Sequence, residues 1–350
     1  MTKQAFPPLP VDEWPDRDQY LWCEAKQSAG PFDDDDGFAA SWRPPTIKGC
    51  ERGYGVWLGW LATNGILNPD LHPCDRITKD RIRAFVLEYR VGRAELTVAA
   101  TIRNLAYVLR ACAPPHGVEW LTKLAHRMMN RAKPSRPKLP RMARVTDVDL
   151  LAEHLMSAGL QQMRKGQRSG AVVYRDGLMI GLLINRALRR LNFGSLRLGY
   201  NFIIDDFGMR MIFPPEETKK GVPLDWSVPE RLEPAVLTYL EEVRPALLKH
   251  GIDDEGWFWI GRRGRRMPDN DISIRVTKAT RKHLGRDLSP HLFRDCVATE
   301  IALERPELIG ISKHLLGHKL LASSQKYYNQ ATSLTAFARH GDVIRKFREK

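Results

Sequence analysis

The sequence predicts a mainly α-helical protein with one small antiparallel β-sheet, an α+β fold divided between two domains. Apolar residues recur at helical spacing through most of the chain, and only residues 196–228 show short strand-like runs. A basic, proline-rich segment separates two helical blocks. The chain has 350 residues, enough for two average domains, and its apolar fraction of 43% is typical of a globular protein.

Composition excludes several classes of protein. No window approaches the roughly 18 uncharged apolar residues of a membrane span. The first residues lack the basic and apolar regions of a secretory signal peptide. The 5 cysteines are odd in number and never form CxxC. This pattern favours reduced thiols in a cytoplasmic protein over a disulfide scaffold or a cysteine-based zinc site.

The chain is strongly basic, with a formal net charge of +14. The first 36 residues hold nine acidic and three basic side chains, so the positive charge resides in the remainder. A surface of that sign attracts polyanions, of which nucleic acid is the commonest large one. The acidic segment 1–37 lacks periodicity, and we expect a flexible tail that either stays solvated or covers the protein's own basic surface.

Residues 38–131 show helical periodicity without strand-like alternation, which predicts an all-α domain of about four helices. Thr78 and Thr97 are candidate N-caps within it. The following stretch RAKPSRPKLPRMAR contains six basic residues, no acid, and a proline at every third position. Since proline breaks helices, residues 132–146 are expected to form an extended linker. The linker either follows a phosphate backbone or is a solvated spacer.

The second block, residues 147–350, begins at a candidate N-cap, Thr146 or Asp147. Strand-like runs separated by turn signals predict an antiparallel meander, and helical patterns flank it on both sides. The expected strands are 202–204, 209–213 and 224–228. The expected helices are 148–164, 170–186, 230–248, 270–284, 292–303, 307–316 and from 324 onward.

Motifs for nucleotide and zinc binding (GxxxxGKS/T, GxGxxG, HExxH) are absent, so we expect neither a cofactor nor a metal. Basic and hydroxyl side chains of the last third offer a different chemistry. His291 and Arg294 are three residues apart and share a helix face. LLGH ends a helix at His318, and Tyr327 and Tyr328 follow nine and ten residues later. Upstream, LRRLNF follows the buried helix, and TKKG lies in a turn between strands.

In this order, the arginine, the hairpin lysine, HLFRD, LLGH and YYNQA resemble the tyrosine recombinases, or phage-type integrases. The likeness covers the chain beyond the acidic head. It implies an α-helical core-binding domain (38–131) and a catalytic domain (147–350) with a C-terminal helical segment, which close as a C-shaped clamp around duplex DNA. The catalytic residues that it implies are Arg189, Arg294 and His318 on the scissile phosphate, Lys219 as general acid, His291 as a proton-handling partner, and a tyrosine nucleophile.

The first arginine of the motif is Arg189 or Arg186. Counting from Arg189 places Phe193 and Leu196 at the family's apolar positions, so we assign Arg189. The family often has an acidic residue three positions after this arginine, where the chain has Asn192. The departure leaves the role of that position open.

We assign Tyr328 as the nucleophile, with Tyr327 as the alternative, because only the second aromatic is always tyrosine in the most similar members. The chemistry is consistent with the residue types. Planar guanidinium groups match phosphate geometry and keep their charge. A phenol, with a pKa near ~10, needs such cations nearby to become a nucleophile. A covalent phosphotyrosine retains the bond energy, so that strands are rejoined without ATP.

Further basic residues are candidate DNA contacts. Five lie in the linker, and four lie in the run RRGRR, which follows the apolar WFWI and is otherwise a solvated loop. They are Lys133, Arg136, Lys138, Arg141, Arg144, Arg262, Arg263, Arg265 and Arg266.

Together these features predict a site-specific DNA recombinase or integrase of a mobile element, which breaks and rejoins strands through a 3′-phosphotyrosyl intermediate without metal or ATP. The expected partners are double-stranded DNA with a specific recombination site and further copies of the chain in a homotetramer on that DNA, with no membrane involved. The expected location is a bacterial or phage-like cytoplasm, associated with the nucleoid. One alternative is a catalytically inactive DNA-binding protein on the same scaffold; another is a metal nuclease, which EDTA would inactivate.

Overall fold

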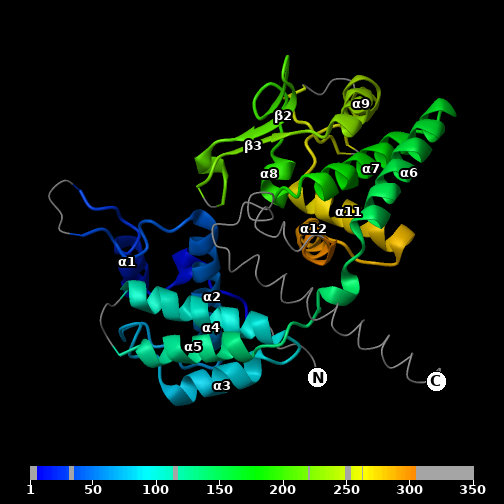
Figure 1. Cartoon of the computed structure of the whole chain (residues 1–350). Helices are drawn as coiled ribbons and strands as arrows, with labels where there is room; N and C mark the ends of the chain where they lie inside the picture. The colour runs from blue at the N-terminus through cyan, green and yellow to red at the C-terminus, as the bar shows by residue number, and fades with distance from the viewer. Residues whose placement is uncertain are drawn as a thin grey trace, which may run out of the picture. The chain divides into compact units, whose positions relative to one another are not determined.

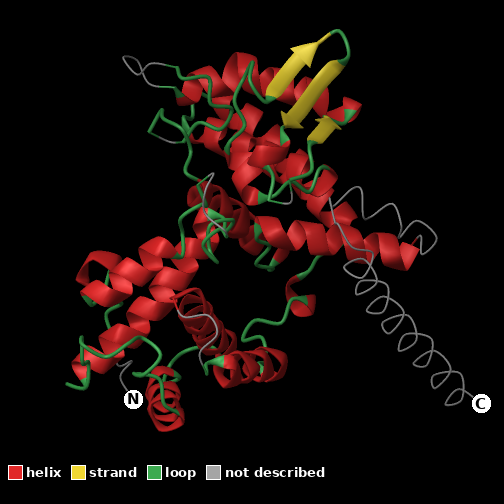
Figure 2. Ribbon diagram, turned by 90° about the vertical axis from the view of Figure 1, so that its left-hand side faces the viewer, coloured by secondary structure: helices red, strands yellow, loops and turns green. Residues whose placement is uncertain are grey.

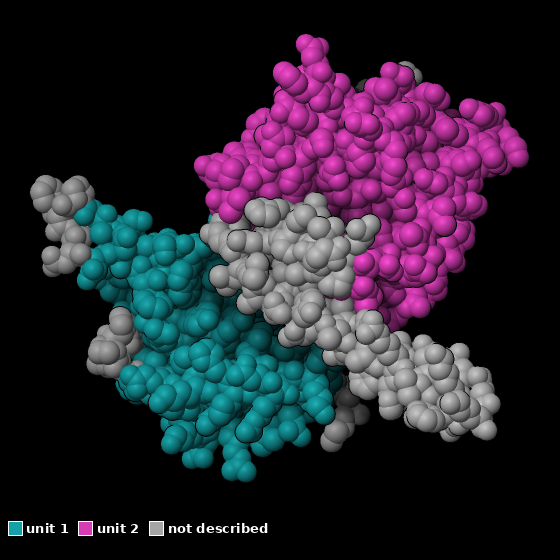
Figure 3. Space-filling view, in the orientation of Figure 1, with its two compact units in different colours: residues 1–137 teal, residues 138–350 magenta. Residues whose placement is uncertain are grey.

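The computed structural model describes residues 6–30, 35–112, 117–219, 221–248, 254–261 and 263–304 (Figures 1 and 2). The chain divides into two compact units, residues 1–137 and 138–350 (Figure 3). The described part of unit 1 contains helices only, and unit 2 combines helices with a three-stranded sheet. The predicted fold class, mainly α with a small antiparallel sheet, is confirmed. None of the described helices has the length and apolar character that a membrane span requires.

Unit 1 is built on helices whose apolar faces meet in one core around Trp57, Leu61 and Phe85. Its elements are a short 3-10 turn η1 (Val11–Glu13), α1 (Asp16–Glu24), α2 (Pro44–Thr63), α3 (Lys79–Tyr89), α4 (Glu95–Cys112) and α5 (Glu119–Arg131). Thr78 caps α3 as predicted, because its side chain accepts a hydrogen bond from the Arg81 N–H at 3.2 Å. Thr97 lies inside α4, so the prediction of an N-cap there is wrong.

The acidic N-terminal segment is a packed part of unit 1 in its described residues, and the prediction of a flexible tail is wrong for them. Trp22 is fully buried, and Asp18 on α1 is only 1% exposed. The Asp18 carboxylate accepts a hydrogen bond from the Tyr54 hydroxyl at 2.6 Å and pairs with the Arg76 guanidinium at 2.5 Å. The acidic composition suggested solvation, but this carboxylate has a partner 58 residues away.

Close backbone contact with α2 secures the start of the same segment. The Leu9 N–H donates to the Gly55 carbonyl at 3.1 Å. A Cβ on Gly55 would lie 2.3 Å from the Leu9 carbonyl oxygen, and one on Gly59 would lie 2.1 Å from that of Pro7. Glycine at both positions is therefore what allows the chain to lie directly on the helix.

Unit 2 has its core around α7, with Leu178, Leu182 and Phe258 fully buried. Its helices are α6 (Val145–Arg164), α7 (Ser169–Asn185), α8 (Arg190–Gly194), α9 (Glu233–Thr238), α10 (Arg244–Leu247), α11 (Asp269–Leu284) and α12 (Pro290–Glu304). Short turns are η2 (Leu139–Arg141), η3 (Pro215–Glu217), η4 (Glu230–Leu232) and the π-helical η5 (Tyr239–Val243), which joins α9 to α10.

Helix α6 begins earlier than expected. Val145 is its first residue, so Thr146 and Asp147 lie inside the helix and the N-cap predicted at either is wrong. The Val145 N–H donates to the Glu300 carboxylate of α12 at 2.6 Å. A side chain from a distant helix thus satisfies a donor that local capping usually satisfies.

The sheet is the predicted meander. It contains β1 (Phe202–Asp205), β2 (Gly208–Phe213) and β3 (Leu224–Ser227), antiparallel in the order β1-β2-β3. Alternate side chains of β2 are buried, which is the pattern of a strand with one face on a core. Met211 pairs with Phe202 on one side and with Trp226 on the other.

The basic linker is shorter than predicted, because its second half is bound to unit 2. The Lys138 ammonium pairs with Asp295 at 2.7 Å, and the Arg141 guanidinium donates to the Asp287 carbonyl at 2.9 Å. Only residues 132–137 remain between the last helix of unit 1 and the first residue of unit 2.

Candidate functional site

Three segments of unit 2 carry the described catalytic candidates, and hydrogen bonds join them. They are the turn between α7 and α8, the connection between β2 and β3, and the first turns of α12. The Arg294 side chain of α12, only 5% exposed, donates to the Ala187 carbonyl in the α7–α8 turn. The Asn192 amide of α8 donates to the Glu217 carbonyl in the β2–β3 connection at 3.0 Å. Residues far apart in sequence are thereby held in one region.

Arg189 lies at the N-cap position of α8 and is half-buried. Burial lowers the pKa of its guanidinium. Within the described part of the chain, this guanidinium makes no hydrogen bond or ion pair. Because a partly desolvated cation without a partner is unfavourable, Arg189 is suited to receive an anion from outside the protein.

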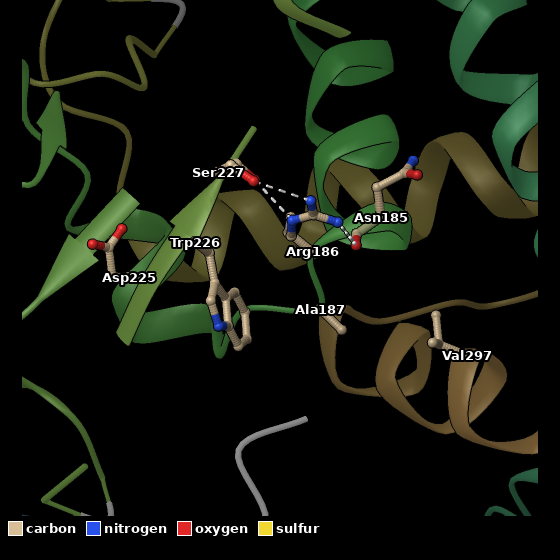
Figure 4. A pocket seen from close by; sticks show the side chains of 7 residues that line it. All are labelled: Asn185, Arg186, Ala187, Asp225, Trp226, Ser227 and Val297. Carbon is tan, nitrogen blue, oxygen red and sulfur yellow. Dashed lines mark hydrogen bonds between the residues drawn. The ribbon is translucent and has the colours of Figure 1, made fainter. Parts of the chain in front are cut away.

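Arg186, the alternative first arginine, is occupied by the protein itself. Its Nε donates to the Ser227 carbonyl of β3 at 2.8 Å, and a second nitrogen donates to the Asn185 carbonyl at 3.1 Å (Figure 4). These bonds fasten the end of α7 to the sheet. The contrast between the two guanidinium groups favours Arg189 as the anion ligand.

A pocket opens beside this turn, bounded by the end of α7, strand β3 and helix α12 (Figure 4). Its volume is about 250 Å³, and its lining residues are Asn185, Arg186, Ala187, Asp225, Trp226, Ser227 and Val297. Ligand pockets for drug-sized molecules measure about 300–1,000 Å³. This hollow is therefore better matched to a single small group than to a large cofactor.

Lys219 lies in the β2–β3 connection, as predicted, and its side chain is exposed. The preceding Thr218 is 2% exposed. Its hydroxyl donates to the Pro215 carbonyl at 3.0 Å and accepts a hydrogen bond from the Val222 N–H at the same distance. The lysine thus extends from a turn that is stabilised by hydrogen bonds between its own residues.

His291 stands in the first turn of α12 and remains accessible to solvent. The protein around it nevertheless lowers its pKa below the ordinary value of 6.5, chiefly by desolvation. The charges of Lys138, Arg294 and Lys219 lower the pKa further, while the Asp295 carboxylate raises it. The imidazole is therefore neutral near pH 7 and able to accept a proton.

Among the predicted DNA contacts of the linker, the structure separates two groups. Lys138 and Arg141 are engaged with unit 2, as described above, and are not free phosphate ligands. Lys133, Arg136 and Arg144 have exposed side chains. These three remain candidates for contact with a polyanion.

The described part of the RRGRR run, residues 263–266, ends at a short antiparallel bridge between Ile260 and Arg266. Gly264 adopts a φ of +75°, which a residue with a side chain rarely accepts. Arg263 and Arg265 are exposed on the turn, and Arg266 stacks on Trp257 with its guanidinium carbon 4.2 Å from the ring centroid. Exposed cations in such a turn are suited to contact a phosphate backbone.

Several predicted features lie outside the described residues. They are Arg262, His318, Tyr327, Tyr328 and the helices expected at 307–316 and from 324 onward. Among the residues that are described, no group of three or more His, Cys, Asp or Glu side chains is arranged to hold a metal ion.

Sequence reasoning missed a basic groove on unit 1, between α3 and α5. Its volume is about 560 Å³, with an apolar floor that includes Trp120 and a rim formed by the cations Lys79, Arg83, Lys123 and Arg127. The sequence carried a signal for it. Both cation pairs are spaced i,i+4, where like charges destabilise a helix by about 0.2–0.5 kcal/mol. Repulsion of this kind is explained if a polyanion binds there.

Comparison with known proteins shows relatives of one kind. The chain is 25% identical over 190 residues to tyrosine recombinase XerC of Azotobacter vinelandii, a match that covers 53% of this chain and 56% of that protein. It is 34% identical over 74 residues to tyrosine recombinase XerC of Pseudomonas aeruginosa PAO1, covering 21% and 24%. The chain thus spans about half the length of the first of these relatives and less of the second. No family model matches the chain.

Solved structures share the fold over nearly the whole chain. The XerH site-specific recombinase bound to palindromic difH substrate, in a post-cleavage complex, aligns with a TM-score of 0.58 at 12% identity, covering 95% of this chain and 99% of that one. Its pre-cleavage complex with difH substrate aligns with a TM-score of 0.57 at 12% identity, covering 92% and 96%. The chain therefore shares the fold of these two structures.

Proposed function

We propose that this chain, a relative of the tyrosine recombinases in sequence and in fold, is a site-specific DNA recombinase that cuts and rejoins strands through a covalent phosphotyrosyl intermediate. The observation that supports the proposal is the guanidinium of Arg189, which has no hydrogen-bond or ion-pair partner among the described residues. Hydrogen bonds join its turn to the β2–β3 connection that carries Lys219 and to the helix α12 that carries His291 and Arg294. Three cations and a neutral imidazole carried by these joined segments are the groups that a phosphodiester requires.

Each described residue has a distinct task in this reaction. Arg189 and Arg294 offer guanidinium donors to the non-bridging oxygens and stabilise the charge that develops there. His291, kept neutral by its lowered pKa, accepts the phenolic proton of the nucleophile. Lys219 supplies a proton to the departing 5′ oxygen. His318 and Tyr328, with Tyr327 as the alternative nucleophile, complete the proposed set from outside the described residues.

DNA is held by surfaces on both units in this proposal. On unit 1, the basic groove places four cations around an apolar floor. On unit 2, Arg263 and Arg265 project from their turn. Such contacts provide affinity and register without reading the base sequence. Other copies of the chain, assembled as a tetramer on the DNA, and a role in a mobile element in a bacterial cytoplasm are parts of the same proposal.

A nicked suicide substrate tests the activity, with DNA sites taken from the regions that flank the gene. Once the nucleophile attacks such a substrate, a short strand is lost and the covalent adduct is trapped. We expect an adduct with the wild-type chain, none with Tyr328→Phe, and a loss of about 10²–10³-fold with Arg189→Ala. The adduct should form equally well in EDTA, unlike the product of a metal nuclease.

The matched variant Tyr327→Phe should retain the adduct, which identifies the nucleophile. An adduct that persists when both tyrosines are changed would exclude the mechanism. Tight, salt-sensitive binding to every tested site without any cleavage would favour the alternative, a DNA-binding protein that has kept the scaffold but not the reaction.

A further inference from the structure

We propose that Asn192 is a positioning residue that holds the general acid Lys219 in register with Arg189. This inference rests on the proposed function and adds a residue to its machinery. Asn192 is only 4% exposed and lies in α8, three residues after Arg189. Its side-chain Nδ2 donates to the Glu217 carbonyl at 3.0 Å, two residues before Lys219. One amide therefore links the helix that carries an arginine to the turn that carries the lysine.

The turn is held from a second direction as well. The Tyr200 hydroxyl donates to a Glu217 carboxylate oxygen at 2.5 Å, from the segment that precedes β1. Buried Thr218 closes the turn with bonds to Pro215 and Val222. Glu217 is thus bonded through both its carbonyl and its carboxylate, and Thr218 is bonded through its hydroxyl, while the Lys219 side chain stays exposed.

The chemistry of position 192 follows from its partner. A carbonyl oxygen requires a hydrogen-bond donor, which an asparagine amide supplies and an ionised carboxylate does not. Related recombinases often carry an acidic residue at the corresponding place in their motif, where this chain has an amide. In this chain, an aspartate at position 192 would direct negative charge at the Glu217 carbonyl from a buried site. The amide is therefore part of how this chain orients its lysine.

The step that Lys219 serves has a defined balance. A bond forms between the tyrosine oxygen and phosphorus while the bond between phosphorus and the 5′ oxygen breaks. The phenolic proton passes to His291, and a proton from Lys219 Nζ passes to the leaving 5′ oxygen. If this oxygen is replaced by sulfur, the leaving thiolate is stable without a proton, since thiols have pKa values near ~8.5.

This difference provides a readout that a merely structural role would not change. Rates of covalent adduct formation are measured for wild type and Asn192→Ala on two suicide substrates, one normal and one with a 5′-bridging sulfur at the cleaved phosphate. Misplacement of a catalytic group by about 1 Å reduces a rate roughly 10²-fold. We expect a loss of about 10- to 100-fold for Asn192→Ala on the normal substrate and recovery to within about threefold of wild type on the sulfur substrate. Lys219→Ala should show the same pattern with a larger loss.

Two further variants separate positioning from folding. Tyr200→Phe removes only the hydroxyl bond to Glu217 from a side chain that is 60% exposed, so the fold should persist, with a smaller loss that sulfur also rescues. Asn201→Ala is the matched control, because Asn201 is also buried, at 2%, and also bonds to backbone, but to Ser195 and Arg197. Its ratio of rates on the two substrates should equal that of wild type.

The outcomes are distinguishable. If the wild-type chain forms no adduct on either substrate, the proposed function fails. If wild type is active but Asn192→Ala loses equal activity on both substrates, or none on either, Asn192 does not position the general acid and the inference is overturned.

Discussion

Replacement of Asp18 by alanine should destabilise unit 1 strongly, because it isolates a buried charge. The Arg76 side chain is fully buried, and Asp18 is its one ion-pair partner among the described residues. Tyr54, whose pKa burial and the Asp18 charge raise well above the ordinary value, would lose its hydrogen-bond acceptor. Both interactions attach the acidic segment, residues 1–37, to the rest of unit 1, although its composition predicted a flexible tail.

The magnitude follows from what remains after the substitution. Removing one partner of a buried ion pair costs about 3–5 kcal/mol. Arg76 keeps its bonds to the carbonyls of Asn68, Pro69 and Leu71, so the lower end, about 3 kcal/mol, applies. For a unit of this size, that lowers the unfolding midpoint by roughly 10 °C.

Thermal unfolding of the full chain, followed by tryptophan fluorescence, measures the effect, because six of the nine tryptophans lie in unit 1. The control is Lys26→Ala, in the same segment. Lys26 forms a partly exposed ion pair with Glu51 at 3.5 Å, and such pairs contribute less than about 1 kcal/mol. If Asp18→Ala and Lys26→Ala lower the midpoint equally, the buried pair does not anchor the segment and this reasoning is refuted.

Two further predictions concern pH and salt. Lys138→Gln removes a cation that lowers the pKa of His291, so the acidic limb of the pH–rate profile for adduct formation should move to higher pH. Asp295→Asn removes the carboxylate that raises this pKa, so the acidic limb should move to lower pH. Shifts of the same sign in both variants would contradict the assignment of His291 as the proton acceptor. Arg83→Gln, in the groove of unit 1, should reduce the slope of log affinity for DNA against log salt concentration by about one. The control Arg17→Gln, at an exposed position outside the groove, should leave this slope unchanged. Equal slopes for the two variants would show that the groove does not contact DNA.

Local signals in the sequence predicted most of the secondary structure. The Thr78 cap and the three strands of the meander depend on neighbours within a few residues, and the structure confirms them. Where a distant residue supplies the partner, the local prediction fails. Glu300 receives the first N–H of α6 from 155 residues away, which is why the start of that helix was misplaced.

Charge was the least reliable guide, for the same reason. The basic side chains of the proline-rich linker were expected to contact DNA or solvent, but Lys138 pairs with a buried carboxylate in α12. The motif order is the basis on which the catalytic candidates are proposed, because motifs record which residue types a reaction needs. It could not identify Asn192 as a positioning residue, since its partner Glu217 is 25 residues away and is contacted through a backbone atom whose identity no sequence pattern reveals.

The close packing of α6 on the start of α7 has a consequence for the turn that follows the other end of α7. A Cβ on Gly159 would lie 2.5 Å from the Tyr174 backbone nitrogen, and one on Gly170 would lie 2.5 Å from the Gly159 carbonyl. Any larger side chain at position 159 or 170 must therefore increase the distance between the two helices. Helix α7 is about 25 Å long, and the turn with Arg189 follows its other end. A larger side chain at either glycine is therefore expected to displace α7 and, with it, the turn that carries Arg189, although no residue of the site is replaced.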